Sequence, residues 1–123
     1  MPEAKNQLRE ESINFAIAIS DICDGINGCS VYVNQLIRCS SSIGANIHEA
    51  KYAQSRADFI SKLEIALKES SETDYWLELL YRKNKLPTEV YHSLKNQCGT
   101  IRRKLIASVT TAKANSARTA RTQ

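Results

Sequence analysis

The chain has 123 residues, of which 42% are hydrophobic and 24% charged, and its formal net charge is only +4. These values fit a single globular domain that buries its own core, and they leave little room for a second domain. No apolar run approaches the roughly 18 residues of a transmembrane helix, and the polar start MPEAKNQLREES is unlike a secretory signal.

The first two predicted helices cover residues 3–26 and 31–53. Apolar residues in the first, including Phe15 and Ile19, recur at the 3-4 spacing of one helix face. A turn-forming stretch of Gly, Asn and Ser at residues 25–30 separates the two helices. Gly44 lies inside the second helix, where glycine costs about 1 kcal/mol relative to alanine. We therefore expect Gly44 to permit the close approach of a neighbouring helix.

The third and fourth predicted helices cover residues 56–84 and 88–112. Ser55 followed by Asp58 is typical of a helix N-cap, and Pro87 suits the start of the next helix. Residues 114–123 are small, polar or basic, which predicts a flexible basic tail after a domain of residues 1–113. Four long helices with short connections predict an all-α, antiparallel up-down four-helix bundle in a single domain.

The charge is unevenly distributed along the chain. Residues 1–89 hold 10 basic and 13 acidic residues, whereas residues 90–123 hold seven basic residues and no acid. Such asymmetry indicates a polyanionic partner. The alternative is that the basic residues form a solvated helix face followed by a flexible tail. The candidate nucleic-acid-binding residues are Lys95, Arg102, Arg103, Lys104, Lys113, Arg118 and Arg121.

The sequence offers no complete catalytic or metal site. Glu89 and His92 form one E-x-x-H motif, but a di-iron bundle needs two such motifs and further glutamates. Glu69 and Glu72 form an E-x-x-E pair without the downstream acidic pair of magnesium-dependent pyrophosphohydrolases. We therefore predict no enzyme activity, no metal and no cofactor, and a hydrolase that uses these two glutamates is the least favoured alternative.

The four cysteines, Cys23, Cys29, Cys39 and Cys98, form no C-x-x-C pair, which argues against structural zinc or redox chemistry. We expect reduced thiols, a cytoplasmic location and no association with membranes.

Polar residues inside the two middle helices form a predicted structural seam. We expect Arg38 to form a buried ion pair with Glu69 or Glu72 and thereby to fix the register of the two helices, so that Arg38→Ala destabilises the bundle. The seam residues are Arg38, Asn46, Glu49, Glu69 and Glu72.

The middle third of the chain resembles the four-helix-bundle family of the 23S rRNA intervening-sequence protein. The matching motifs are Q-L-x-R at residues 35–38, S-I-x-A-N-I-x-E-A at 42–50, S-x-x-D-F at 55–59, I-A-L-K-E at 65–69 and E-T-x-Y-W-L at 72–77. The Asn27-Gly28-Cys29 connection lacks the Phe-Pro turn of many relatives.

The resemblance implies a homopentameric bundle with basic surfaces. The family that the chain resembles also includes the accessory protein of diversity-generating retroelements. That protein binds a reverse transcriptase and its template RNA and supports mutagenic cDNA synthesis. The first hypothesis is accordingly a non-enzymatic, oligomeric nucleic-acid-binding protein, with RNA expected as the ligand rather than DNA. The alternative is a protein-protein adaptor, or a structural bundle, that does not bind nucleic acid directly.

Overall fold

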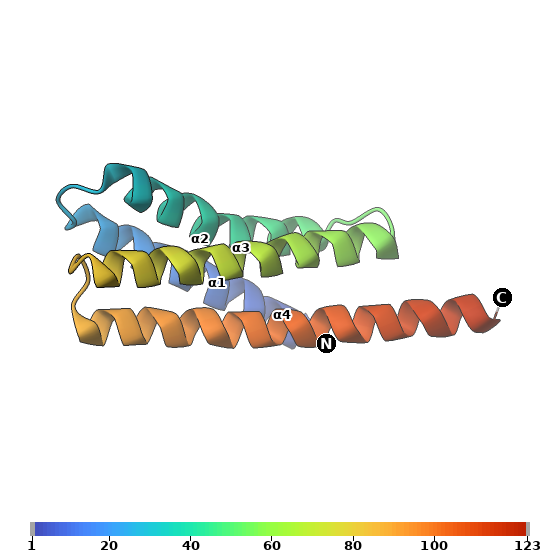
Figure 1. Cartoon of the computed structure of the whole chain (residues 1–123). Coiled ribbons are helices and arrows are strands. Elements are labelled where there is room, and N and C mark those ends of the chain that lie inside the picture. Colours follow the sequence, from blue (N-terminus) through green and yellow to red (C-terminus); the bar gives the residue numbers. More distant parts are fainter. Residues whose placement is uncertain (1, 123) are drawn as a thin grey trace.

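The computed structural model describes the backbone of residues 2–122 and the side chains of residues 7–119. It contains four helices: α1 (Pro2–Asp24), α2 (Ser30–Ala50), α3 (Arg56–Arg82) and α4 (Thr88–Thr122). The chain runs up and down the bundle, so that each helix packs against its two neighbours in the order α1, α2, α3, α4 (Figure 1). The predicted all-α four-helix bundle is confirmed. No helix among the described residues is long and apolar enough to cross a membrane.

The core consists of the predicted apolar faces. Phe15, Ile43, Leu77 and Leu105 are fully buried and come from all four helices. The turn before α2 carries Gly28 and Cys29 in the left-handed backbone region, with φ angles of 79° and 56°. The close approach expected at Gly44 is present, because a Cβ built there would lie 3.1 Å from Ser12 Oγ of α1.

The ends of α3 follow local capping chemistry. Ser55 Oγ accepts the backbone N–H of Asp58 at 3.0 Å, as the sequence predicts. Asp58 Oδ2 in turn accepts the backbone N–H of Gln54 at 3.2 Å. At the other end Asn84 adopts a φ of 61°, and the Lys85 N–H reaches back to the Leu80 carbonyl at 2.9 Å. This is the bonding of a Schellman-type C-cap with asparagine at the left-handed position.

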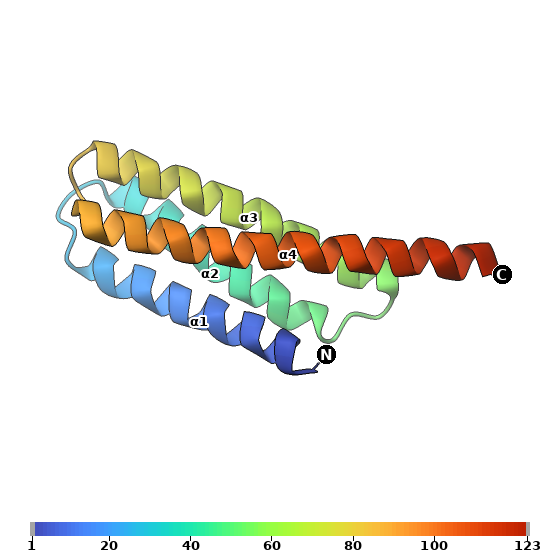
Figure 2. The same ribbon diagram turned by 90° about the horizontal axis from the view of Figure 1, so that it is seen from below.

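The last helix is longer than predicted. The composition predicts an end near residue 112 and a flexible tail from 114 to 123, but α4 continues to Thr122. Residues 113–122 contain neither Gly nor Pro and are rich in Ala and basic residues, which favour helix. The extension projects beyond the ends of the other helices in both views (Figures 1 and 2). We call residues 113–122 the α4 extension.

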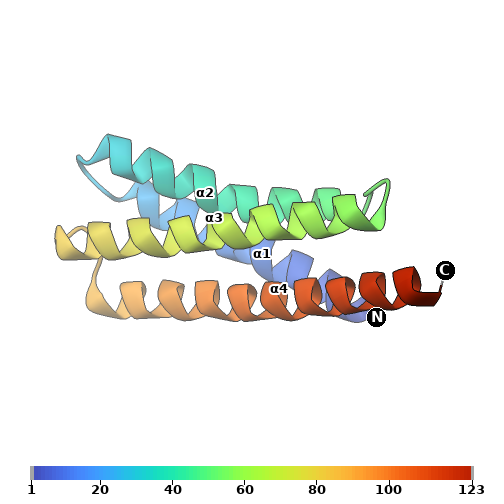
Figure 3. The ribbon, with the colours of Figure 1, turned by 45° about the vertical axis from the view of Figure 1, so that its right-hand side comes forward.

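The two chain ends lie at the same end of the bundle as the α2–α3 connection (Figure 3). The first residues of α3 contact the α4 extension there, because Arg56 Nη1 donates a hydrogen bond to Thr119 Oγ1 at 3.0 Å. The up-down topology therefore brings the charges of residues 50–56 close to those of the C-terminal helix, although more than 50 residues separate them in the sequence.

Candidate nucleic-acid interface and polar seam

The basic residues of α4 face different environments. Arg103, Lys113 and Arg118 are exposed, whereas Lys95, Arg102 and Lys104 are half-buried at the sides of the helix. Arg121, the seventh candidate, lies outside the residues whose side chains the structure describes. The candidates thus occupy several sides of α4 and do not form one uniform stripe.

Carboxylates from the neighbouring helices pair with half of the six described candidates. These carboxylates come from α1 and α3, the two helices that flank α4. Residues 90–123 therefore contain no acid themselves, but acids of the neighbouring helices lie against them. The ion pairs join Lys95 Nζ to Asp74 Oδ1 at 3.4 Å, Lys113 Nζ to Glu64 Oε2 at 2.9 Å, and Lys104 Nζ to Glu11 Oε1.

The other three candidates, Arg102, Arg103 and Arg118, form no ion pair with any described residue. Arg103 Nη2 donates to the neutral Thr100 Oγ1 at 3.2 Å, so its charge stays uncompensated. Guanidinium groups bind phosphate in a bidentate fashion and keep their charge at any physiological pH. These three arginines are the part of α4 that is best suited to a polyanion.

Two further uncompensated cations lie at the end of the bundle that carries the α4 extension. Lys51 and Arg56 are exposed and form no ion pair among the described residues. Sequence reasoning did not identify them, because they belong to the acid-containing part of the chain. The folded topology brings Arg56 to α4, where it donates a hydrogen bond to Thr119.

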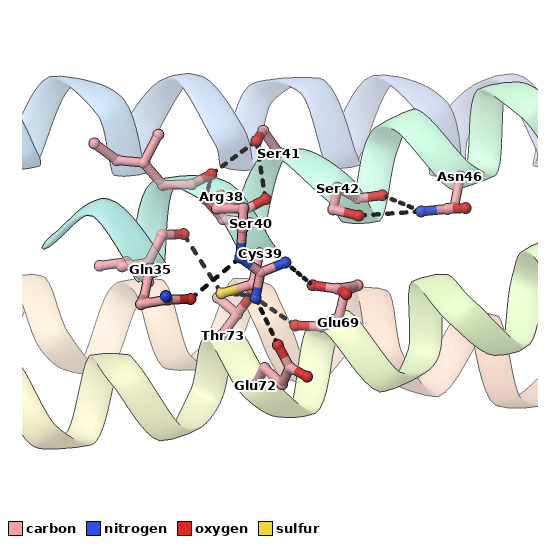
Figure 4. A network of polar contacts seen from close by, with 12 residues as sticks. Gln35, Arg38, Cys39, Ser40, Ser41, Ser42, Asn46, Glu69, Glu72 and Thr73 are labelled. Atoms are coloured by element: carbon pink, nitrogen blue, oxygen red, sulfur yellow. Dashed lines mark hydrogen bonds and ion pairs between the residues drawn. The ribbon is translucent and has the colours of Figure 1, made fainter. Parts of the chain in front are cut away.

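The structural seam is centred on Arg38 of α2 (Figure 4). Arg38 Nη2 contacts Glu72 Oε2 at 2.8 Å, and Nη1 contacts Glu69 Oε2 at 3.3 Å, so one guanidinium bridges α2 to two successive turns of α3. Arg38 Nε also donates to Gln35 Oε1 at 3.1 Å. The hydrogen bond to Glu72 and the charges of both carboxylates raise the already high pKa of Arg38, although partial desolvation opposes the shift.

The remaining seam residues belong to separate contacts. Asn46 Nδ2 donates to the carbonyl and hydroxyl oxygens of Ser42 on its own helix, at 2.9 and 3.1 Å (Figure 4). Glu49 lies 3.5 Å from Lys62 Nζ of α3. Sequence spacing placed these polar groups on one helix side, but local bonding divides them into three independent contacts.

The Arg38 ion pair is more exposed than the sequence analysis expected, because the Arg38 side chain retains 52% of its accessible surface. Solvent screens such a pair, and exposed ion pairs contribute roughly 0–1 kcal/mol. We therefore expect Arg38→Ala to lower the free energy of unfolding by less than about 1 kcal/mol. Urea denaturation followed by circular dichroism measures this, with Arg82→Ala, which removes the exposed Arg82–Glu78 pair, as the matched control. If Arg38→Ala lowered the free energy of unfolding several times more than Arg82→Ala, solvent would not screen the Arg38 ion pair as we expect.

Comparison with known proteins agrees with this architecture. A sequence model of the 23S rRNA-intervening sequence protein family matches residues 4–107. The chain belongs to this family. A crystal structure of a protein of unknown function from the S23 ribosomal protein family of Bacteroides thetaiotaomicron is similar, with 43% sequence identity and a TM-score of 0.83. The similarity covers 87% of this chain and 98% of that one. No curated protein matches the sequence significantly.

Neither the family nor the solved relative carries a description as an enzyme. Among the described residues, no three His, Cys, Asp or Glu side chains are grouped so that they could hold a metal ion. Glu69 and Glu72, the acids that the hydrolase alternative requires, both contact the Arg38 guanidinium. The two carboxylates that would bind a divalent cation are therefore already paired with a guanidinium.

The cysteine thiols give a further prediction. All four are free, and burial raises the pKa of Cys98 to about 12 and that of Cys23 to about 11, with Asp74 and Asp24 adding to the respective shifts. Because the thiolate is the reactive form, we expect both to resist iodoacetamide at pH 8 in the folded protein. Cys29, half-buried in the α1–α2 turn, should react first. Peptide mass spectrometry after timed labelling checks the order, and equal rates in urea provide the control.

Proposed function

We propose that this protein is a non-enzymatic, oligomeric nucleic-acid-binding protein of the cytoplasm, with RNA rather than DNA as its ligand. The observation that carries the proposal is a set of three arginines on α4 that form no ion pair with a described residue, Arg102, Arg103 and Arg118. They lie on a helix that has no acid after Glu89. The family takes its name from intervening sequences of 23S rRNA, which supports an RNA context for the chain.

Contacts of this kind recognise the phosphate backbone and carry no base sequence information. The proposal therefore predicts affinity for many sequences and a strong dependence on salt, because each neutralised phosphate releases condensed counterions. We expect log affinity for a single-stranded RNA to fall linearly with log salt, with a slope of about −0.7 for each phosphate contact. Fluorescence anisotropy between low and physiological salt measures the slope. A flat response would contradict the proposal.

Assembly of several copies would repeat the same arginines on one particle. We propose a homo-oligomer, and a pentamer in particular, as the resemblance implies. An assembly of this kind would have apolar side chains to bury, among them Ile17 of α1 and Ile106 of α4, which are 53% and 47% exposed. Light scattering at several protein concentrations measures the mass of the particle and so the number of copies in it. A mass near 13.8 kDa at all concentrations would exclude an oligomer.

The second candidate function is a protein-protein adaptor, with a reverse transcriptase as the partner that the resemblance implies. It is favoured by a groove of about 520 Å³ on the outer side of α2 and α3, next to the exposed Tyr75 and half-buried Trp76. Tyrosine, tryptophan and arginine are enriched at the centres of protein interfaces, and the Arg38 ion pairs lie on the same two helices. A pull-down with and without nuclease separates the candidates, because only direct protein contact survives the digestion.

A further inference from the structure

We infer that the bundle end formed by the end of α2 and the α4 extension binds single-stranded nucleic acid, with Tyr52 as a base-stacking residue. This inference rests on the proposed function and adds the class of nucleic acid and the group that recognises it. We call Lys51, Tyr52, Arg56 and Arg118, together with His48, the stacking end.

Tyr52 is an unusually open aromatic residue. It follows the last turn of α2 and keeps 67% of its surface exposed, which is more than any other described aromatic side chain. The ring of His48, one turn earlier and also exposed, meets it edge-on with 5.4 Å between centroids and an angle of 62°. With 67% of its surface exposed, the Tyr52 side chain offers a ring surface on which a nucleobase can stack.

The surroundings of Tyr52 are cationic. Lys51 Nζ lies 5.8 Å from the centroid of the Tyr52 ring. Lys51, Arg56 and Arg118 form no ion pair with described residues, and Arg56 is linked to the α4 extension through Thr119.

The acids nearby are already engaged. Glu49 pairs with Lys62, Glu64 pairs with Lys113, and Asp58 accepts a backbone N–H at the start of α3. Glu49 and Glu64 therefore pair with lysines other than the three cations of the stacking end, and Asp58 is held at the N-terminus of α3.

Neither the opposite end of the bundle nor the other exposed tyrosine offers this combination. At the opposite end, Lys83 and Lys85 are accompanied by the exposed acids Asp24 and Glu89. Tyr75 is 60% exposed on α3, but its groove holds a single lysine, Lys68, together with Glu72. Among the described residues, the stacking end differs in joining an open ring to several cations without ion pairs, whereas Tyr75 has one such lysine, Lys68, beside the acid Glu72.

This combination selects single strands on physical grounds. In a duplex the bases stack on one another, so their flat surfaces are hidden and only phosphates and groove edges are offered. In a single strand the bases are free to stack on an aromatic side chain, while basic groups follow the backbone. Removal of Tyr52 should therefore weaken binding to a single strand and leave the phosphate contacts with a duplex unchanged.

The test compares one RNA of about 15 nucleotides, single-stranded and as a duplex, by fluorescence anisotropy at fixed salt. We expect Tyr52→Ala to weaken single-strand binding about tenfold, and Tyr52→Phe, which keeps the ring, to restore it. Duplex binding and the salt slope should not change, because no charge is removed. Val31→Ala, which removes a side chain that is 68% exposed at the other end of α2, is the control for loss of an exposed apolar group. Circular dichroism verifies that every variant is folded.

The outcomes separate the inference from the function on which it rests. If the wild-type protein binds neither form of RNA, the proposed function fails. If it binds RNA but Tyr52→Ala leaves single-strand affinity unchanged, or weakens both forms equally, the stacking inference fails and the proposed function stands. Equal sensitivity of polyglutamate binding to Tyr52→Ala would also overturn the inference, because the surface would then recognise negative charge without bases.

Discussion

Replacement of Arg102, Arg103 and Arg118 by glutamine should reduce the affinity for RNA about 30-fold at physiological salt. The three side chains carry charges that no described acid offsets, so each is available to a phosphate. Loss of each such contact should lower the magnitude of the salt slope for single-stranded RNA by about 0.7. The loss of affinity should be similar for unrelated RNA sequences, since phosphate contacts do not identify bases.

The structure supplies a matched control with the same change in net charge. Replacement of Lys95, Lys104 and Lys113 by glutamine also removes three cations from α4, but these already pair with Asp74, Glu11 and Glu64. The three carboxylates that lose their lysine partners would repel RNA, but salt screens charges over about 8 Å at physiological ionic strength and so limits this repulsion at a distance. We expect this variant to lose less than about fivefold in RNA affinity. Equal losses of RNA affinity in the two triple variants would show that binding depends on the total charge of α4 and not on whether a cation is paired with a carboxylate.

The contrast between these two sets of residues shows where sequence reasoning reached its limit. The acid-free C-terminal stretch was evident from the sequence, and so was the helix that carries it. The sequence did not show which carboxylates flank that helix, because Glu11 and Glu64 are 93 and 49 residues away from their partners Lys104 and Lys113. Local periodicity determines which side of a helix is apolar, whereas the identity of the neighbour at its margin depends on topology.

Two other differences have the same origin. The polar seam of the two middle helices predicts a buried ion pair for Arg38, but Arg38 lies at the margin of the α2–α3 contact and its side chain remains half exposed. The end of α4 was placed too early because residues 113–122 have no apolar face to predict packing. The chain continues as helix there, and Arg56 of α3 holds its side chain against Thr119. In both cases the core was predicted correctly and the boundary residues were not.

The core itself provides the largest expected effect on stability. Phe15→Ala should lower the free energy of unfolding by about 3–5 kcal/mol. Phe15 is fully buried and faces the centre of the bundle from α1. A neighbouring turn of α1 contains Ser12, which is also fully buried and lies against Gly44 of α2. This tight backbone approach prevents α1 from moving inward to fill the space that the ring leaves, so most of the cavity should persist.

The matched control is Ile17→Ala, two residues further along the same helix, where the side chain is 53% exposed. It removes a large apolar group without a cavity, and surface substitutions of this kind change stability by about 0.5 kcal/mol or less. Urea denaturation at one fixed protein concentration compares the variants, because self-association would make the apparent stability depend on concentration. Similar losses for the two variants would mean that Ile17 is buried in solution. That result would place the outer side of α1 in a contact between copies, and a repeat at lower concentration would then reduce the Ile17 effect and leave the Phe15 effect in place.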